Sequence, residues 1–336
     1  MSQVSCDAIF AVLAKHYTKV GITIVNNLID LDTLLASRPD LVFLGMEFIP
    51  NNLLPGLADP HKIWLSDVLD QHGIAYTGSG QMAHELGRNK HQAKQRVLDA
   101  KLRTSPFCII RQTQTIDSNY VALNFPLFIK PTNRGGGVGI DSDSVAYCFE
   151  QLQSKVNSIS NVLHADALIE EYLPGREFSV AILKGEDSSE YSVMPIELVA
   201  PPDNNGIRVL SNKVKSSNME KALAVVDEVI KSEVATLALD VFHALGARDY
   251  GRIDIRLDAD GVPNFLEANL IPSLISGYGS FPKACVLNIG LSYDSMIMRI
   301  ATLGLAHNAC STEAILEPIA MNNLIFPSSE IAFEPA

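Results

Sequence analysis

The sequence contains few of the residues that build disulfide frameworks or zinc sites. Its 336 residues include five cysteines, eight histidines and one tryptophan. The cysteines show no C-x-x-C spacing and are odd in number, which argues against a disulfide framework and against a thiolate metal site. The histidines form no H-x-x-x-H pair, so a zinc site is not expected either. Any bound metal should be held by oxygen.

Positive charge and long apolar runs are also scarce. The formal net charge is −12 and the isoelectric point is about 5.1, so nucleic acid is not an expected partner. The longest apolar stretch near the N-terminus covers residues 8–14, whereas a membrane span needs roughly 18 apolar residues. The composition predicts a cytoplasmic protein that binds neither nucleic acid nor membrane.

The chain does contain enough apolar sequence for two or three packed units, since 47% of its residues are hydrophobic. In the first ninety residues, short apolar runs alternate with helical stretches, which is typical of a small α/β layer with parallel strands. These runs are 22–25, 41–45, 63–72 and 74–76. A glycine-containing break at 78–80 precedes a predicted helix over 82–100. The expected domains are 1–89, 90–177 and 178–336.

A glycine-rich loop follows the predicted strand 125–129, which ends in Lys130. The loop contains Gly135, Gly136, Gly137 and Gly139. Such a strand and loop can bring backbone N–H groups close to phosphates. The spacing fits neither a Walker A loop nor a dinucleotide-binding fingerprint, and a mobile hairpin is the simpler interpretation of this motif alone.

Further strands and a long polar connection follow. Strand 167–172 carries Glu170 and Glu171, and Glu177 precedes strand 178–183. Residues 201–218 form a long polar connection, which is typical of a functional lid. Helices are predicted over 222–245 and over most of 281–305.

The most informative stretch is the predicted β-hairpin 250–269, whose turn is Asp258-Ala-Asp-Gly261. If Leu257 pairs with Val262, Arg252 lies opposite Glu267. Alternation then places on one face Arg252, Asp254, Glu267 and Asn269. The opposite face should hold Ile253, Ile255, Leu266 and Ala268. Three oxygen-bearing side chains beside an arginine suit Mg²⁺, although alternating charges are more often a solvent-exposed face.

Taken in order, these motifs resemble the ATP-grasp superfamily and, within it, D-alanine:D-alanine ligase. The resemblance covers roughly residues 65–300 and includes the phrases Gly73-Ile-Ala-Tyr-Thr-Gly-Ser79, Pro174-Gly-Arg-Glu-Phe178 and Leu266-Glu-Ala-Asn269. It implies an α/β (α+β) fold of three domains with ATP held between two sheets. It further implies a ligase that joins a carboxylate to an amine through an acyl phosphate, and it allows a homodimer.

The resemblance also implies roles for individual residues. The residues expected to bind ATP are Lys90, Lys130, Gly135, Gly136, Gly137, Glu170, Glu171, Tyr172, Leu173 and Glu177. Lys213 would approach the γ-phosphate from the lid, and Arg252, with the backbone near Ser273, would stabilise the oxyanion. Two Mg²⁺ ions, with Mn²⁺ as an alternative, would be bound by Asp254, Glu267 and Asn269.

The resemblance fails around the family's first substrate. Where that family has a serine and a tyrosine, this sequence has Gly136 and, after Lys213, Val214. Residues 1–25 contain no glutamate to match the family's early one, and Tyr278 stands where a substrate-contacting serine is expected. Three interpretations follow: an amino-acid or dipeptide ligase of altered specificity, an authentic D-alanine:D-alanine ligase, or a nucleotide-binding homologue without catalysis.

Overall fold

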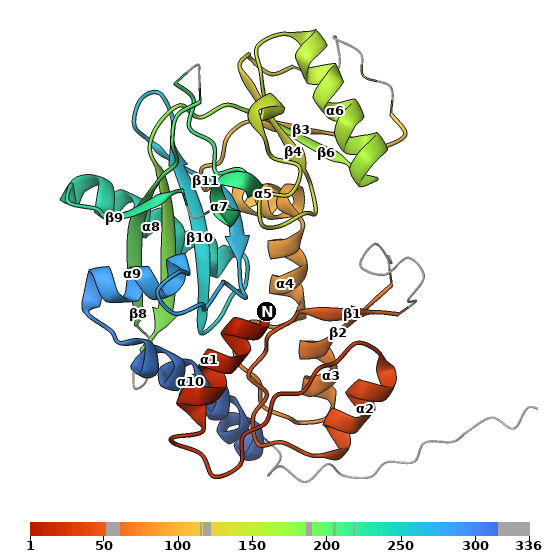
Figure 1. Ribbon diagram of the computed structural model, residues 1–336, viewed down its shortest axis with the longest axis vertical. Coiled ribbons are helices and arrows are strands. Elements are labelled where there is room, and N and C mark those ends of the chain that lie inside the picture. The colour runs from red at the N-terminus through yellow and green to blue at the C-terminus, as the bar shows by residue number, and fades with distance from the viewer. Residues whose placement is uncertain are drawn as a thin grey trace, which may run out of the picture.

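The computed structural model describes residues 1–51, 61–114, 116, 122–185, 190–203, 206–217 and 219–314. Its fold is mixed α/β, with a five-stranded sheet, a four-stranded sheet and a smaller N-terminal part (Figure 1). Three residues of the predicted lid (204, 205 and 218) and the tail 315–336 lie outside these ranges. Within them, no helix is both long and apolar enough to cross a lipid bilayer.

The five-stranded sheet is antiparallel throughout and has the order β11-β10-β7-β8-β9. Its strands are β7 (Glu177–Lys184), β8 (Tyr191–Val199), β9 (Lys221–Ala224), β10 (Tyr250–Leu257) and β11 (Pro263–Asn269). Along β7, Phe178, Val180 and Ile182 pack into one core, whereas Ala181 and Leu183 pack into another. This alternation follows from the period of two in a strand.

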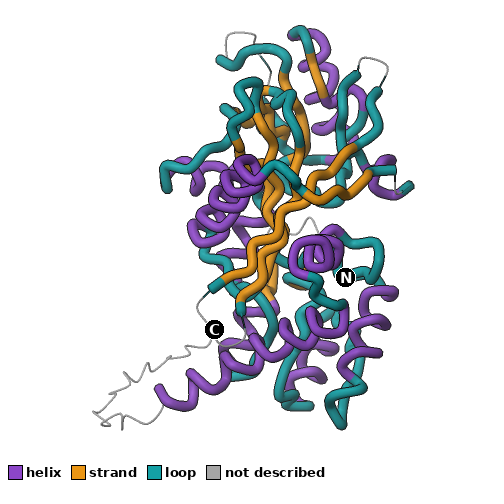
Figure 2. Tube along the Cα trace, turned by 90° about the vertical axis from the view of Figure 1, so that its left-hand side faces the viewer, coloured by secondary structure: helices purple, strands orange, loops and turns teal. Residues whose placement is uncertain are grey.

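Helices cover both faces of this sheet, and the strands run between them in Figure 2. Against one face pack α4 (Gln81–Arg88), α5 (Lys90–Asp99) and α8 (Glu228–Ala244). Against the other face packs α9 (Ser280–Ile289), and α1 (Gln3–Leu13) and α10 (Tyr293–Ala314) extend the same hydrophobic cluster. The sheet is thus the centre of the hydrophobic core.

The four-stranded sheet has the order β3-β6-β4-β5 and is also antiparallel. Its strands are β3 (Phe107–Ile110), β4 (Leu127–Pro131), β5 (Val145–Ala146) and β6 (Ala167–Glu171). A 3₁₀ turn, η2 (Ser142–Ser144), precedes β5. Helix α6 (Phe149–Leu163) covers one face through Leu152, Val156 and Ile159.

The N-terminal part differs from the predicted layer of parallel strands. It contains α2 (Leu28–Ala36), α3 (Leu65–Gln71) and an antiparallel pair, β1 (Phe48–Pro50) with β2 (Lys62–Trp64). The described parallel pairing there is one bridge, between Val42 and Tyr76. Run 22–25 forms no strand, and its Ile22 and Ile24 are exposed, whereas parallel strands are buried on both faces.

Two predicted helices also differ from the observed ones. The helix over 82–100 is divided at Asn89, whose backbone is extended. The helix over 222–245 begins later, because residues 221–224 pair with β8 as β9. Helix α8 then starts where the Asp227 side chain accepts hydrogen bonds from the N–H groups of Val229 and Ile230.

Candidate functional site

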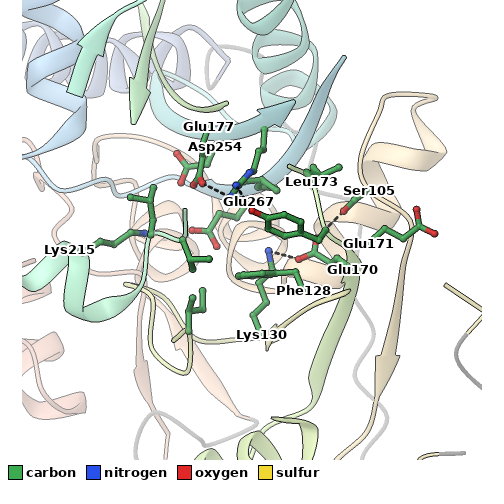
Figure 3. A pocket seen from close by; sticks show the side chains of 16 residues that line it. Ser105, Phe128, Lys130, Glu170, Glu171, Leu173, Glu177, Lys215, Asp254 and Glu267 are labelled. Atoms are coloured by element: carbon green, nitrogen blue, oxygen red, sulfur yellow. Dashed lines mark hydrogen bonds and ion pairs between the residues drawn. The ribbon is translucent and has the colours of Figure 1, made fainter. Parts of the chain in front are cut away.

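A pocket takes its walls from both sheets (Figure 3). Its polar residues on the two sheets include Lys130, Glu170, Glu171, Glu177, Asp254 and Glu267. Tyr172 and Leu173, which follow β6, also line it. The sheets therefore bring together most of the residues that the sequence predicts to bind the nucleotide.

A buried carboxylate lies between two lysines at the base of this pocket. Glu170 is 2% exposed, and its oxygens lie 2.5 Å from Lys94 Nζ and 2.7 Å from Lys130 Nζ. Burial alone would raise the pKa of Glu170, but Lys130 and Lys94 outweigh it and hold that pKa below its ordinary value. The expected contact of Glu170 with adenine stays a prediction.

Lys94 is a residue that sequence reasoning missed. It is completely buried and also donates to Thr104 Oγ1, to Ser105 Oγ and, over 3.3 Å, to the carbonyl of Phe265. Burial lowers the pKa of Lys94 to about 8, because the attraction of Glu170 offsets only part of the effect of burial. Its position four residues after Lys90, on the same helix, was the available signal.

Glu177 is likewise paired with a residue that the sequence did not single out. Arg256 Nη1 lies 3.0 Å from Glu177 Oε2, and Arg256 also donates to the hydroxyl of Tyr172. Burial raises the pKa of Glu177 although Arg256 opposes this. The predicted contact of Glu177 with the ribose stays a prediction.

The hairpin β10–β11 has a different register from the predicted one. Asp254 lies opposite Glu267 and Arg252 opposite Asn269, with a bulge between Asp254 and Ile255. Leu266 is the extra residue on β11, so it lines the pocket, while Phe265 takes the core position. The four polar side chains still share one face, because the bulge compensates for the shifted turn. The prediction that Leu266 lies on the core face was wrong.

Cations surround the two facing carboxylates. Arg252 Nη2 lies 2.9 Å from Asp254 Oδ2, and Lys90 Nζ lies 3.3 Å from Glu267 Oε2. Burial would raise the pKa of Glu267, but the cations nearby, above all Lys90, Lys215 and Lys130, draw it well below its ordinary range. Glu267 is therefore ionised at neutral pH.

These residues fit a magnesium site by their chemistry. Asp254, Glu267 and Asn269 place two carboxylates and an amide on one sheet face, and Mg²⁺ is bound by few protein oxygens besides those of phosphates and water. Among the described residues, no three acidic, histidine or cysteine side chains form a metal-binding cluster, so Asn269 would have to supply the third oxygen.

A second cleft opens beside this pocket. Both cavities are lined by Leu210, Lys215, Asp254 and Glu267. Of the predicted residues, those in the cleft include Lys90, Gly135, Gly136, Arg252, Asn269 and Ser273. The cleft therefore meets the pocket at the facing carboxylates.

The lid places Lys215, and not Lys213, at this junction. Helix α7 (Asn212–Ser216) is short, and residues two apart on a helix face different directions. Lys215 lines both cavities, whereas Lys213 is exposed and lines neither. Val214 is buried against Ala200 and Leu210. The role predicted for Lys213 therefore fits Lys215, and Val214 does not occupy the position after the lid lysine.

The glycine loop contacts this helix. Gly136 and Gly137 have φ of 65° and 77°, in the left-handed region. The Asn212 amide donates to the carbonyl of Gly136 over 3.1 Å, and a Cβ on Gly137 would lie 2.8 Å from the backbone nitrogen of Asn212. Gly137 lets the two backbones approach, so the loop and the lid meet over the site.

The N-terminal part contributes a glutamate that the sequence interpretation did not find. Glu47 lines the cleft and lies 3.6 Å from Arg88 and 3.7 Å from His84. It follows the apolar run 41–45, beyond the first 25 residues in which a glutamate was sought.

Comparisons with known proteins point to a single family. Residues 98–302 match the family model described as the D-ala D-ala ligase C-terminus. A D-alanine–D-alanine ligase of Cupriavidus metallidurans is 29% identical over 248 residues, 73% of each chain. An uncharacterized protein of Sinorhizobium fredii is 31% identical over 278 residues, 81% of this chain and 77% of that one. The crystal structure of a D-alanine–D-alanine ligase from Bacillus anthracis complexed with ATP has the same fold, with a TM-score of 0.69 at 19% identity over 92% of this chain and 94% of that one.

Proposed function

Because the chain belongs to the D-alanine–D-alanine ligase family, we propose that it is an ATP-grasp ligase that joins an amino acid or a larger carboxylate to an amine. The observation that carries the proposal is the meeting of two cavities at Lys215, Asp254 and Glu267. One cavity suits ATP, and the other suits the acid and the amine.

The proposed reaction has two steps. A substrate carboxylate oxygen attacks the γ-phosphorus of ATP, and ADP leaves with the electrons of the broken P–O bond. The amine nitrogen then attacks the acyl carbon, loses a proton and expels phosphate, leaving an amide. Such transfers depend mainly on positioning and on neutralising charge.

The residues expected to contact phosphate, metal and oxyanion have a place in this scheme, with Lys215 instead of Lys213. Lys90, Lys130 and Lys215 would neutralise phosphate oxygens, and Arg252, with the backbone near Ser273, would stabilise the tetrahedral oxyanion. Two Mg²⁺ ions, or Mn²⁺, would be held by Asp254, Glu267 and Asn269, and would supply further charge neutralisation to the phosphates. The glycine loop and the lid would exclude water from the acyl phosphate.

The cleft favours a substrate that carries an amino group. Glu220 lines the cleft, where its carboxylate would pair with a substrate ammonium. We therefore propose an amino acid as at least one of the two substrates.

D-alanine joined to itself is not the substrate pair that we expect to be preferred. Gly136 provides no hydroxyl where the family has a serine, and an absent partner at a substrate site typically costs about 1 to 3 kcal/mol. The smaller residue also leaves room for a bulkier acid.

The test is Mg²⁺-dependent ADP release and product mass across D- and L-amino acids and larger acids with varied amines. We expect turnover with a pair other than two D-alanines. If D-alanyl-D-alanine forms with the highest kcat/KM, the chain is an authentic D-alanine:D-alanine ligase. If ATP binds and no pair releases ADP, the chain is a nucleotide-binding homologue without catalysis.

Within this test, Glu267→Gln should fold and lose turnover by at least about 100-fold, because one carboxylate of the proposed metal site is neutralised. Cys148→Ala, at an exposed cysteine outside both cavities, is the control and should keep wild-type turnover. Wild-type turnover by Glu267→Gln would refute the metal assignment.

A further inference from the structure

Helix α7, which presents Lys215 to the site, has little to hold it in place by itself. It comprises five residues, Asn212–Ser216, too few for an isolated helix to be stable in water. Its apolar anchor is Val214, packed against Ala200 and Leu210. The direction in which Lys215 points must therefore depend on contacts that α7 makes with other segments.

Two such contacts lie at opposite ends of α7. At its start, Asn212 donates to the carbonyl of Gly136 in the glycine loop of the four-stranded sheet. At its end, the hydroxyl of Tyr278 donates to the carbonyl of Lys215 over 2.5 Å. Tyr278 lies in the connection between β11 and α9, so α7 is tied to both halves of the site.

The ring of Tyr278 is itself held on the side of the five-stranded sheet. The ammonium of Lys283, on α9, lies 5.7 Å from the centroid of the Tyr278 ring. Gly279, next to Tyr278, is buried, and a Cβ there would lie 2.4 Å from the carbonyl oxygen of Ser273. The backbone of this turn is thus closely packed at Gly279, whereas the Tyr278 side chain is 36% exposed and is held by its contacts with Lys283 and with the carbonyl of Lys215.

We propose that Tyr278 is a positioning residue that holds α7 so that Lys215 faces the junction of the two cavities, beside Asp254 and Glu267. The inference rests on the proposed function, because Lys215 matters only if a phosphate is transferred there. The serine expected at this place would contact the substrate. Tyr278 instead donates a hydrogen bond to the backbone of the lid, beside the cleft.

The test compares Tyr278→Phe, which removes only the hydroxyl, with the wild type. Hydrogen exchange of a peptide spanning 211–217 should be about fivefold faster in the variant, since one hydrogen bond is typically worth about 1 kcal/mol. The relevant amides are those of Lys215 and Ser217, which bond to the carbonyls of Ser211 and Lys213. Tyr76→Phe, which loses a comparable bond to Asp70 in the N-terminal part, is the control and should leave exchange in 211–217 unchanged.

Turnover supplies a second readout. In Tyr278→Phe, kcat should fall by about tenfold with the KM for ATP within about twofold, because Tyr278 does not line the nucleotide pocket. More ADP should be released per amide formed, because a loosened lid admits water to the acyl phosphate.

Two outcomes separate this inference from the proposed function. Unchanged exchange in 211–217, together with a raised KM for the amine alone, would make Tyr278 a substrate contact and overturn the inference. If the wild type releases no ADP with any substrate, the proposed function fails and so does the effect on turnover. Faster exchange in Tyr278→Phe would then still show the contact between Tyr278 and α7.

Discussion

At the scale of single residues, the buried trio of Lys94, Glu170 and Lys130 connects the two halves of the protein. Lys94 belongs to α5, which packs on the five-stranded sheet, whereas Glu170 and Lys130 belong to the four-stranded one. Burying three charges is unfavourable unless all are paired, and removing one partner typically costs about 3 to 5 kcal/mol. The trio therefore requires its members to remain together.

We expect Glu170→Gln to lower the free energy of unfolding at pH 7 by about 3 kcal/mol, because it leaves two buried lysines unpaired. The folded-state pKa of Glu170 lies below its ordinary value, so its contribution is present above the unfolded-state pKa of about 4.3. That contribution is lost as pH falls through the folded-state pKa. The difference between wild type and variant should therefore shrink below about pH 4.

Urea unfolding of both proteins at several pH values from about 3 to about 7 measures this difference in the free energy of unfolding. The neighbouring Glu171→Gln is the matched control, since Glu171 is only half-buried and accepts hydrogen bonds from Asn124. A difference of constant size at every pH would mean that the charge of Glu170 is not what stabilises the fold.

At the scale of elements, the bulge in β11 decides which side chains face the nucleotide pocket. Phe265 is completely buried in the core, and the next residue, Leu266, is half-buried at the pocket. Without the extra residue, strand alternation would turn Glu267 and Asn269 away from Asp254 and Arg252. The polar face of the hairpin thus depends on an irregularity.

Alanine substitutions at two neighbouring residues of β11 should accordingly have different effects. Phe265→Ala should destabilise the protein by about 3 to 5 kcal/mol, because it empties a core position. Leu266→Ala should cost less than about 1.5 kcal/mol and should raise the KM for ATP several-fold, because it removes a wall of the pocket. Thermal unfolding and ATP kinetics measure the two effects. The reverse order of stabilities would show that Leu266 faces the core.

At the scale of the whole molecule, polar contacts join the two parts around the pocket that both sheets line. Besides the buried trio, Lys90 Nζ donates to the carbonyl of Arg134 over 2.6 Å, and Thr104 pairs with Phe265. A ligand that touches both sheets should therefore stabilise the assembled molecule.

A non-hydrolysable ATP analogue with Mg²⁺, at about 100 times its Kd, should stabilise the wild type by about 2.7 kcal/mol and raise the Tm. Lys130→Ala should lose most of this shift, because the lysine lines the pocket. Cys108→Ala, on the same sheet but outside the pocket, should keep it. Differential scanning calorimetry of each variant with and without ligand gives the comparison, and equal shifts in both variants would exclude Lys130 from nucleotide binding.

The sequence by itself determined which chemical groups are present, in which order, and which of them share a face of one strand. Alternation along β10 correctly put Ile253 and Ile255 in the core and Asp254 toward the site, because a strand's period of two is local. The ordered motifs likewise sufficed to recognise the family.

The tertiary structure alone decided register, docking and burial. The bulge that moves Leu266, the choice of Lys215 over Lys213, the burial of Lys94 and the place of Glu47 in the cleft all depend on contacts between residues far apart in the chain. A short helix such as α7 has no strong pattern of its own, so its partners decide which side faces the site. Local periodicity cannot encode these relations, because strand register and the docking of loops are set by packing across the whole molecule.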